Sequence, residues 1–310
     1  MTENSYDVLV VGGGAAGLNA ALMLGRARRR VVVVDGGSPR NAPAEHMHGF
    51  LSRDGLPPSE LLKIGREELA GYGVEVLEDQ VSALEPGFTA RLASGRELTA
   101  RRVLVATGVH DDLPDLPGLR ESWGTDAVTC PYCHGYEVRD RPLGVLGTEP
   151  ASVEHALLVR QWSPDVVYFA HTAPLSEEDR ERLGARGVKV VDGTVTALRR
   201  EDGHLTGLEL GARFVPRAAL FIRTQTVPHD ELIRGLGYEE TDAMGKTNVP
   251  GVWAAGNVVD ARATVIIAAA QGAAAGGALN HDLVTEDVRR AVDAFGGFTP
   301  EAERAAAAAR

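Results

Sequence analysis

The stretch Tyr6-Asp7-Val8-Leu9-Val10-Val11-Gly12-Gly13-Gly14-Ala15-Ala16-Gly17 decides the fold that this chain is expected to adopt. Its apolar first half predicts a buried strand, and its second half fits the pattern G-x-G-x-x-G. A helical segment follows to about residue 28, and a second strand, residues 31–34, ends in Asp35. A strand, a glycine loop, a helix and a strand with a terminal acid together predict a βαβ unit that holds a dinucleotide.

The glycine loop and the acid have distinct expected roles. Gly12 makes the turn, Gly14 admits the pyrophosphate, and Gly17 lets the helix pack close to the sheet. Asp35 accepts hydrogen bonds from the ribose hydroxyls. The alternative is a glycine-rich turn that holds no ligand, and the presence of all four elements in order argues against it.

The composition excludes several classes of partner. The 310 residues are 44% hydrophobic, and 43 acidic against 32 basic residues give a net charge of −11. This charge opposes binding to nucleic acid or to an anionic membrane. The most apolar late stretch, residues 265–279, is broken by glycines and is shorter than the roughly 20 residues of a membrane span. With no basic leader segment evident, we expect a cytoplasmic enzyme.

The only two cysteines form a Cys-x-x-Cys pair, Cys130 and Cys133, and His134 follows directly. Such a pair can cycle between a dithiol and a disulfide. It could instead be half of a zinc site, but the chain has no second Cys-x-x-Cys to complete the ligand set. Two inert cysteines that are neighbours by chance are a third possibility. In a cytoplasmic enzyme the redox interpretation is favoured.

Two further segments of the first half carry functional signals. Residues 36–55 read as a long irregular loop that contains His46 and His48, which could face an active site or lie on a mobile surface. Residues 103–105 form an apolar strand that leads into Ala106-Thr107-Gly108.

A second βαβ pattern, residues 142–170, has a loop that is chemically wrong for a pyrophosphate. Only Gly147 remains of a glycine triplet, Glu149 brings a negative charge, and Pro150 removes a backbone donor. After the following strand, Ala170-His171-Thr172 stands where a basic cluster could hold a 2′-phosphate. The sequence therefore predicts that the fold persists here without NADPH.

The last quarter of the chain returns to the first unit. A strand at Val252 runs into a Gly256-Asn257 turn, and a helix rich in Ala and Gly follows from about Thr264 to Leu283. Small residues let a helix lie very close to a neighbour or a cofactor, and its free N-terminal amides favour electron-rich oxygens.

These motifs, in this order, resemble the thioredoxin reductase-like superfamily of FAD-dependent pyridine nucleotide-disulfide oxidoreductases. The resemblance implies an α/β fold of two Rossmann-like (FAD/NAD(P)-binding, three-layer ββα) domains, the second inserted in the first. Residues 1–117 and 244–310 would bind FAD, and residues 118–243 would form an NAD(P)H-binding-like domain that carries the cysteines. It also implies a homodimer and these FAD contacts: Gly12, Gly14, Ala15, Ala16, Gly17, Asp35, Gly36, Asn41, Ala106, Thr107, Gly108, Gly256, Asn257, Thr264 and Val265.

Two departures from the thioredoxin reductase pattern indicate a particular branch of the superfamily. Thioredoxin reductases usually carry an aspartate after the second cysteine, where this chain has His134, and they carry the NADPH loop that is missing here. The sequence Cys-Pro-Tyr-Cys-His-Gly is closer to the branch of FAD-dependent dithiol oxidases that act on natural products such as gliotoxin and holomycin. This implies a small-molecule dithiol and oxygen as partners, with electrons passing through FAD.

The resemblance also implies a division of roles in the redox pair. Cys130 would form the mixed disulfide with the substrate, Cys133 would leave as a thiolate beside the flavin, and His134 would take a proton. In a simpler interpretation His134 only starts a helix. Two rival functions stay open: an NADPH- or ferredoxin-linked reductase of thioredoxin or a similar disulfide, and a flavin redox sensor without turnover.

Overall fold

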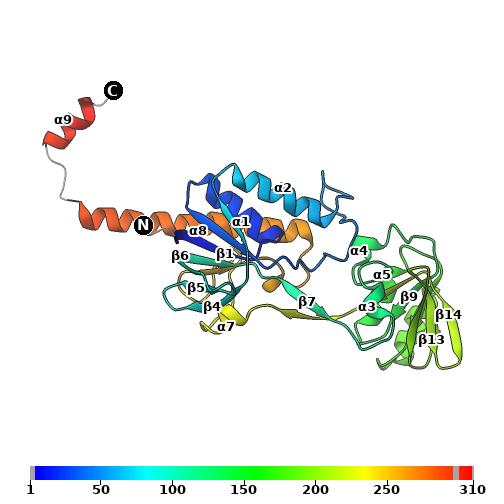
Figure 1. The fold of residues 1–310 in the computed structure, drawn as a ribbon. Coiled ribbons are helices and arrows are strands. Elements are labelled where there is room, and N and C mark those ends of the chain that lie inside the picture. The colour runs from blue at the N-terminus through cyan, green and yellow to red at the C-terminus, as the bar shows by residue number, and fades with distance from the viewer. Residues whose placement is uncertain (1–3, 296–299, 309–310) are drawn as a thin grey trace.

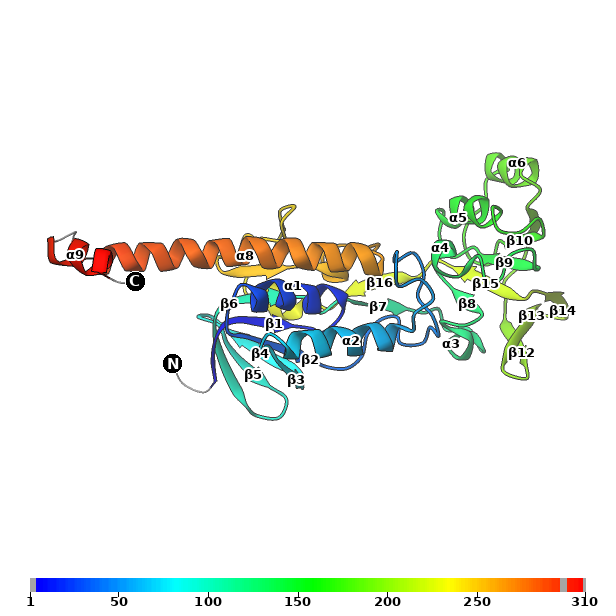
Figure 2. The ribbon, with the colours of Figure 1, turned by 90° about the horizontal axis from the view of Figure 1, so that it is seen from above.

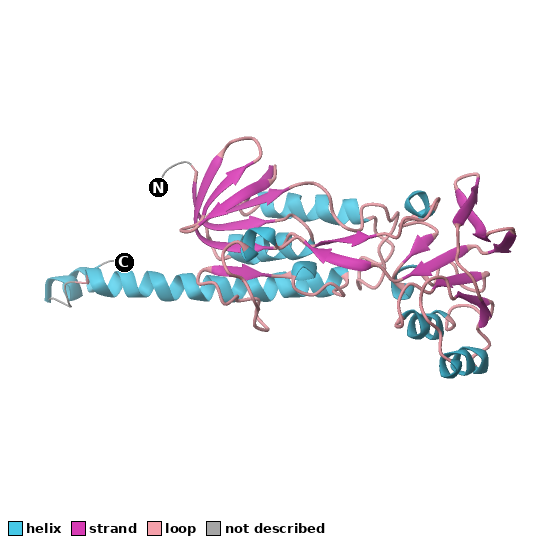
Figure 3. Ribbon diagram, turned by 90° about the horizontal axis from the view of Figure 1, so that it is seen from below, coloured by secondary structure: helices cyan, strands magenta, loops and turns pink. Residues whose placement is uncertain are grey.

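The computed structural model describes residues 4–295 and 300–308, and two mainly parallel β-sheets organise it (Figure 1). Helices pack on both sheets. Two antiparallel strands, β7 (Val109–Asp112) and β16 (Gln225–Pro228), run between the sheets. Figure 3 shows this strand pair as the link between the two parts of the molecule. The predicted α/β class with Rossmann-like sheets is confirmed.

The first sheet has its most buried strand at its centre. β1 (Ser5–Val11) pairs in parallel with β2 (Val31–Asp35) and with β6 (Glu97–Val105). Val8 and Val10 face one hydrophobic cluster and Leu9 and Val11 face another, which explains the continuous apolar run. The remaining strands of this sheet are β3 (Glu75–Glu78), β4 (Val81–Glu85), β5 (Thr89–Leu92) and β17 (Val252–Ala254).

Three helices pack together against one face of this sheet: α1 (Ala15–Arg26), α2 (Pro58–Ala70) and α8 (Val265–Ala294) (Figure 2). The approach of α8 to α1 tolerates only small residues. A Cβ added at Gly272 would lie 2.0 Å from the Ala16 carbonyl oxygen, and one at Gly276 would lie 2.8 Å from that of Ala20. The Ala- and Gly-rich composition of α8 is therefore a packing requirement.

Several predicted boundaries differ from the structure. The strand predicted at 103–105 is the end of a longer strand, β6, whose interior Arg101 and Arg102 reach ion-pair partners on α8. β3 and β4 are separated by a turn at Asp79, whose side chain accepts a hydrogen bond from the Gln80 amide. α8 continues past the predicted end at Leu283 to Ala294, and ion pairs at Glu286 and Asp287 support the first turn of this extension.

The second sheet is parallel, with strand order β11-β10-β9-β15-β8. A three-stranded antiparallel meander covers one of its faces, and two helices cover the other. The parallel strands are β8 (Ala127–Val128), β9 (Leu143–Leu146), β10 (Val166–Phe169), β11 (Lys189–Val191) and β15 (Ala219–Ile222). The meander and helices are β12 (Ala197–Glu201), β13 (His204–Leu210), β14 (Arg213–Pro216), α5 (Ser152–Val159) and α6 (Glu177–Ala185). The short helices are α3 (Leu119–Ser122), α4 (Pro131–His134), α7 (Glu231–Arg234), a 3-10 turn at Gly256–Val258 and α9 (Pro300–Ala308).

Residues 229–243 lie within the predicted inserted domain but pack against the first sheet. Ile233 is fully buried in the core of that sheet, and Leu236 and Tyr238 pack against this core. The chain therefore rejoins the first part directly after β16. The division at 117/118 and 243/244 itself stays a prediction.

Candidate active site

A cavity of about 1120 Å³ lies at the carboxyl ends of the parallel strands β1, β2 and β6. This is the edge where open α/β sheets bind ligands. The volume suits a dinucleotide, since smaller ligands occupy roughly 300–1,000 Å³. The predicted site residues that line this cavity are Gly12, Gly14, Ala15, Ala16, Asp35, Gly36, Asn41, Ala106, Thr107, Gly108, Cys130, Cys133, His134, Gly256, Asn257, Thr264 and Val265.

The glycine loop has the geometry that its predicted roles require. Gly12 has φ +104°, and a Cβ there would lie 2.4 Å from the Ala106 carbonyl oxygen. A Cβ on Gly17 would lie 1.9 Å from the Gly12 carbonyl oxygen. Gly17 is buried beneath the loop and does not line the cavity, and its contact with FAD stays a prediction. Its role is to let α1 start directly under the loop.

The start of α1 is open to a ligand. Gly14 is its N-cap and offers no side-chain hydrogen bond, and the first turn holds no acidic residue. A Cβ at Gly14 would meet nothing within 4 Å. The free amides and the positive end of the helix dipole can therefore meet a pyrophosphate.

Asp35 lies at the cavity, but its carboxylate already has protein partners. It accepts hydrogen bonds from the amides of Gly13 (3.2 Å) and Gly37 (3.3 Å), and it pairs with Arg66 on α2. A carboxylate has enough lone pairs to accept further bonds from ribose hydroxyls. No periodic pattern in the sequence identified Arg66.

Asn257 supports the loop before α8. Its Nδ2 donates to the carbonyl oxygens of Asp260 (3.0 Å) and Ala263 (2.9 Å). The Gly256 amide donates to Oε1 of Gln271 at 3.0 Å. The amide of Asn257 therefore has a structural reason: an aspartate would place an acceptor against two carbonyl oxygens.

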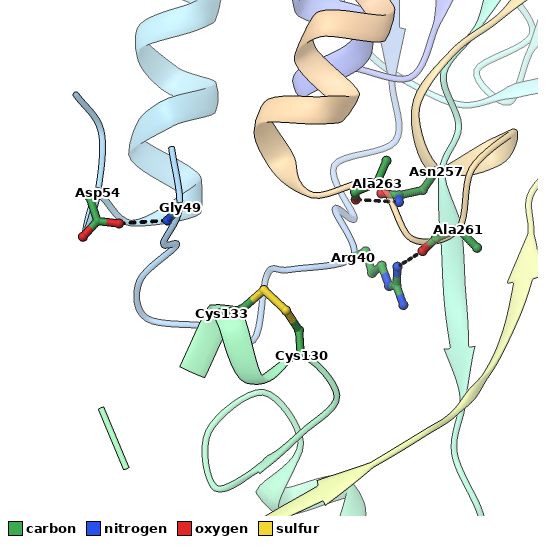
Figure 4. The surroundings of a disulfide bond; sticks show 8 residues. All are labelled: Arg40, Gly49, Asp54, Cys130, Cys133, Asn257, Ala261 and Ala263. Atoms are coloured by element: carbon green, nitrogen blue, oxygen red, sulfur yellow. Dashed lines mark hydrogen bonds between the residues drawn. A yellow bond between two sulfur atoms is a disulfide. The ribbon is translucent and has the colours of Figure 1, made fainter. Parts of the chain in front are cut away.

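Arg40 and Asp111 form a half-buried ion pair at the cavity wall, which the sequence did not predict. Both guanidinium–carboxylate contacts measure 2.7 Å, and Arg40 also donates to the Ala261 carbonyl at 2.9 Å. Thr224 donates to Asp111 at 2.7 Å. Figure 4 shows Arg40 between the Ala261 loop and the disulfide.

Cys130 and Cys133 form a disulfide at the start of α4, with their Cα atoms 5.2 Å apart. Cys130 is the N-cap and Pro131 occupies the first turn, where its missing N–H costs nothing. Both cysteines line the same cavity as the glycine loop (Figure 4). Among the residues that the structure describes, no group of three or more metal-ligating side chains could share an ion.

His134 follows Cys133 and also lines the cavity. Burial lowers its pKa below the ordinary value; Glu137 opposes this effect and His48 adds to it. Its Nδ1 is buried without a hydrogen-bond partner in the described part of the chain. A neutral imidazole with an uncommitted nitrogen can accept a proton from a thiol near neutral pH.

His155 is a residue near the site that the sequence analysis missed. It is almost fully buried on α5 and packs edge-on against Phe221. Burial lowers its pKa to about 4 and Arg223 adds to this effect, while a hydrogen bond with the Thr129 backbone opposes it. A histidine within the mainly apolar helix 152–159 is the sequence feature that could have identified this residue.

The second glycine loop is closed by its own side chains. Ser152 Oγ accepts hydrogen bonds from the amides of Thr148 and Glu149, each at 3.3 Å, and Glu149 pairs with Arg223. At Gly147 an added Cβ would lie 2.6 Å from the Tyr168 hydroxyl. This loop therefore satisfies internally the amides that the first loop leaves free.

The position expected for a 2′-phosphate cluster is also occupied. His171 has a left-handed backbone, with φ 45°, and its Nδ1 accepts a hydrogen bond from the Val195 amide at 3.1 Å. The imidazole is therefore committed to the adjoining backbone.

The chain belongs to the pyridine nucleotide-disulphide oxidoreductase family, whose model matches residues 6–277. It is 35% identical over 223 residues to the "Probable thioredoxin reductase" of Arthroderma benhamiae, a match that covers 65% of this chain and 55% of that protein. It is 41% identical over 160 residues to thioredoxin reductase aclD of Aspergillus oryzae, covering 49% of this chain and 51% of aclD. The chain thus spans about half the length of these two relatives. The crystal structure of HlmI superposes with a TM-score of 0.92 at 55% identity, covering 95% of this chain and 97% of HlmI.

These findings confirm the predicted superfamily, fold class and cofactor, and with them an FAD-dependent oxidoreductase of this family. The cavity fits FAD on its own geometry, since the bare glycine loop and the open α1 terminus can hold a pyrophosphate beside the disulfide. The individual contacts with FAD stay a prediction. No helix among residues 4–295 and 300–308 is long and apolar enough to cross a membrane.

The Asn257 loop leads to a direct test. In Asn257→Asp, two hydrogen bonds would be replaced by acceptor–acceptor contacts, and we expect the FAD-loaded protein to lose about 1–3 kcal/mol of unfolding free energy. Denaturant titration with a parallel measurement of retained FAD checks this. Asn280→Asp on α8 is the control, because Asn280 uses only its oxygen, as an acceptor from Arg29 at 2.8 Å. Equal stability of the two variants would contradict this role.

Proposed function

We propose that this protein is an FAD-dependent dithiol oxidase, which forms a disulfide in a small-molecule dithiol through Cys130 and Cys133 and passes the electrons to oxygen. One observation carries the proposal: the second nucleotide loop is closed by Ser152 and the Glu149–Arg223 pair, whereas the first loop is open. A dinucleotide pyrophosphate there would have to displace a carboxylate and compete for bonded amides. The thiol is then the electron source.

The residues of the chain divide the thiol chemistry between them. A substrate thiolate attacks Sγ of Cys130 and the Cys133 sulfur leaves, giving a mixed disulfide. The second substrate thiolate attacks the substrate sulfur of that bond, which releases the product disulfide and the Cys130 thiolate. His134 accepts the proton of the attacking thiol, since its side chain lines the same cavity as the two cysteines.

FAD, when bound, takes two electrons from the enzyme dithiol and delivers them to oxygen. The overall reaction is balanced: one dithiol and one oxygen molecule give one disulfide and one hydrogen peroxide. The two thiol protons end on the peroxide, so a base that holds one of them between half-reactions is required.

The decisive experiment mixes the oxidised holoenzyme anaerobically with either dithiothreitol or NADPH. We expect dithiothreitol to bleach the flavin and NADPH to leave it oxidised, because the second loop has no free amides for a pyrophosphate. In air, dithiothreitol should yield one peroxide per disulfide. Cys133→Ser should retain FAD and lose the bleaching. Fast bleaching by NADPH would establish the rival reductase, and no reaction with any dithiol would favour a sensor.

The role of His134 predicts a pH dependence. The base must be neutral, and burial lowers the pKa of His134, so the rate should stay constant near pH 7 and fall only in more acidic solution. His134→Ala should slow flavin reduction roughly 100-fold or more and abolish that acidic decline. His204→Ala, at an exposed histidine of β13, is the control. An unchanged profile in His134→Ala would remove this residue from the mechanism.

We also infer a homodimer. Val284, Val288 and Val292 recur every four residues on α8 and are 43%, 56% and 66% exposed. They form one apolar stripe on the part of the helix that extends beyond the sheet (Figure 2). This stripe could pack against its counterpart in a second copy.

The dimer is tested by light scattering of the wild type and of a variant with both Val288→Glu and Val292→Glu. We expect the variant to be a folded monomer, because two charges would be buried in the interface. Arg289→Glu, on an exposed position outside the stripe, should remain a dimer. A variant that stays dimeric would contradict this surface.

A further inference from the structure

The loop between β2 and α2, residues 36–57, contacts the segment that carries the disulfide. One contact is made by His48, whose two ring nitrogens both face carboxylates. Nδ1 lies 3.3 Å from Asp54 Oδ2, in the same loop, and Nε2 lies 3.4 Å from Glu137 Oε1. Glu137 follows α4, three residues after His134. Nδ1 makes a hydrogen bond with Asp54, and Nε2 lies within ion-pair distance of Glu137, so the ring lies between the two carboxylates.

The tip of this loop is a small closed structure. The Met47 amide donates to the Leu56 carbonyl (3.0 Å) and the Gly55 amide donates back to Met47 (2.9 Å). The Gly49 amide donates to Asp54 at 2.8 Å, and Met47 is buried. Figure 4 labels Gly49 and Asp54 in the loop that passes close to the helix carrying Cys133. These hydrogen bonds hold the loop tip in one conformation, so His48 is held in place relative to Glu137.

A second contact joins the loop to the other side of the disulfide segment. Gly124 has φ +83°, and a Cβ there would lie 2.5 Å from Pro43 Cβ. Gly124 precedes β8, and Glu137 follows α4, so the two contacts flank Cys130 and Cys133. The sheets themselves are linked through β7 and β16, a two-strand connection about which the disulfide segment could rotate.

We propose that His48 is a positioning residue: through Glu137 it ties the β2–α2 loop to the segment after α4 and holds the Cys133 sulfur toward the FAD cavity. This inference rests on the proposed function, in which electrons pass from the cysteines to the flavin. His48 lines the cavity and Glu137 does not, so a variant at Glu137 tests the link apart from any direct contact of His48 with a ligand.

The test uses a Cys130→Ser background, in which Cys133 is a free thiolate. A thiolate that faces oxidised flavin gives a long-wavelength charge-transfer absorption, and this readout needs neither substrate nor oxygen. Adding His48→Ala or Glu137→Ala should weaken the absorption roughly 1.5- to fivefold, as expected for losing a partly exposed polar contact, while FAD content is unchanged. The variant with both substitutions should be no weaker than either alone, because they remove the same link.

Leu51→Ala is the matched control, because Leu51 belongs to the same loop and is 87% exposed. Its absorption should equal that of the Cys130→Ser parent. Gly124→Ala should weaken the absorption independently, through the Pro43 contact. Undiminished absorption in His48→Ala, or independent effects of His48→Ala and Glu137→Ala, would overturn the proposal. Failure of dithiols to reduce the wild type would sink the proposed function alone, since the absorption still decides about His48.

Discussion

The Arg40–Asp111 ion pair is the contact on which the site depends. It joins the β2–α2 loop to the linker strand β7, while Arg40 reaches the loop before α8 and Asp111 accepts from Thr224 at the returning linker. Burial by itself would raise the pKa of Asp111, but the hydrogen bonds from Arg40 and Thr224 hold it below its usual range. The charged pair thus fixes four chain segments around one wall of the cavity.

The two nucleotide-type loops share one strand–loop–helix architecture and differ in whether their backbone amides are free. Both follow a buried parallel strand and lead into a helix. In the first, Gly14 leaves the α1 amides free; in the second, Ser152 and the Glu149–Arg223 pair occupy the corresponding region. The second fold persists because its core of apolar side chains does not depend on the loop. The closed second loop beside the open first loop is the basis of the proposed electron flow from thiol to flavin.

The disulfide is held by contacts that reach it from several elements. The β2–α2 loop meets both flanks of the disulfide segment, through Pro43 and through His48. His134 lies in the same wall, and its lowered pKa reflects burial produced by this convergence. A proton acceptor, a redox pair and a cofactor cradle are thus brought together by parts of the chain that are distant in sequence.

The sequence by itself determined the local units and their chemistry. Period and composition predicted β1, α1 and β2, the glycine roles of Gly12 and Gly17, and the redox character of Cys130 and Cys133. The defective second loop was also readable, because Glu149 and Pro150 are unsuited to phosphate wherever they lie. Each of these features depends on residues that are close together in the sequence, so a short segment is enough to predict it.

Only the tertiary structure decided the contacts between distant segments. Arg40 and Asp111 are 71 residues apart, Asp35 and Arg66 are 31 apart, and His48 meets Glu137 across two different sheets. Charged residues in loops carry no periodic signal, and their partners are set by how the sheets and helices pack. The length of β6 has the same origin, since Arg101 and Arg102 find carboxylate partners on β1 and α8.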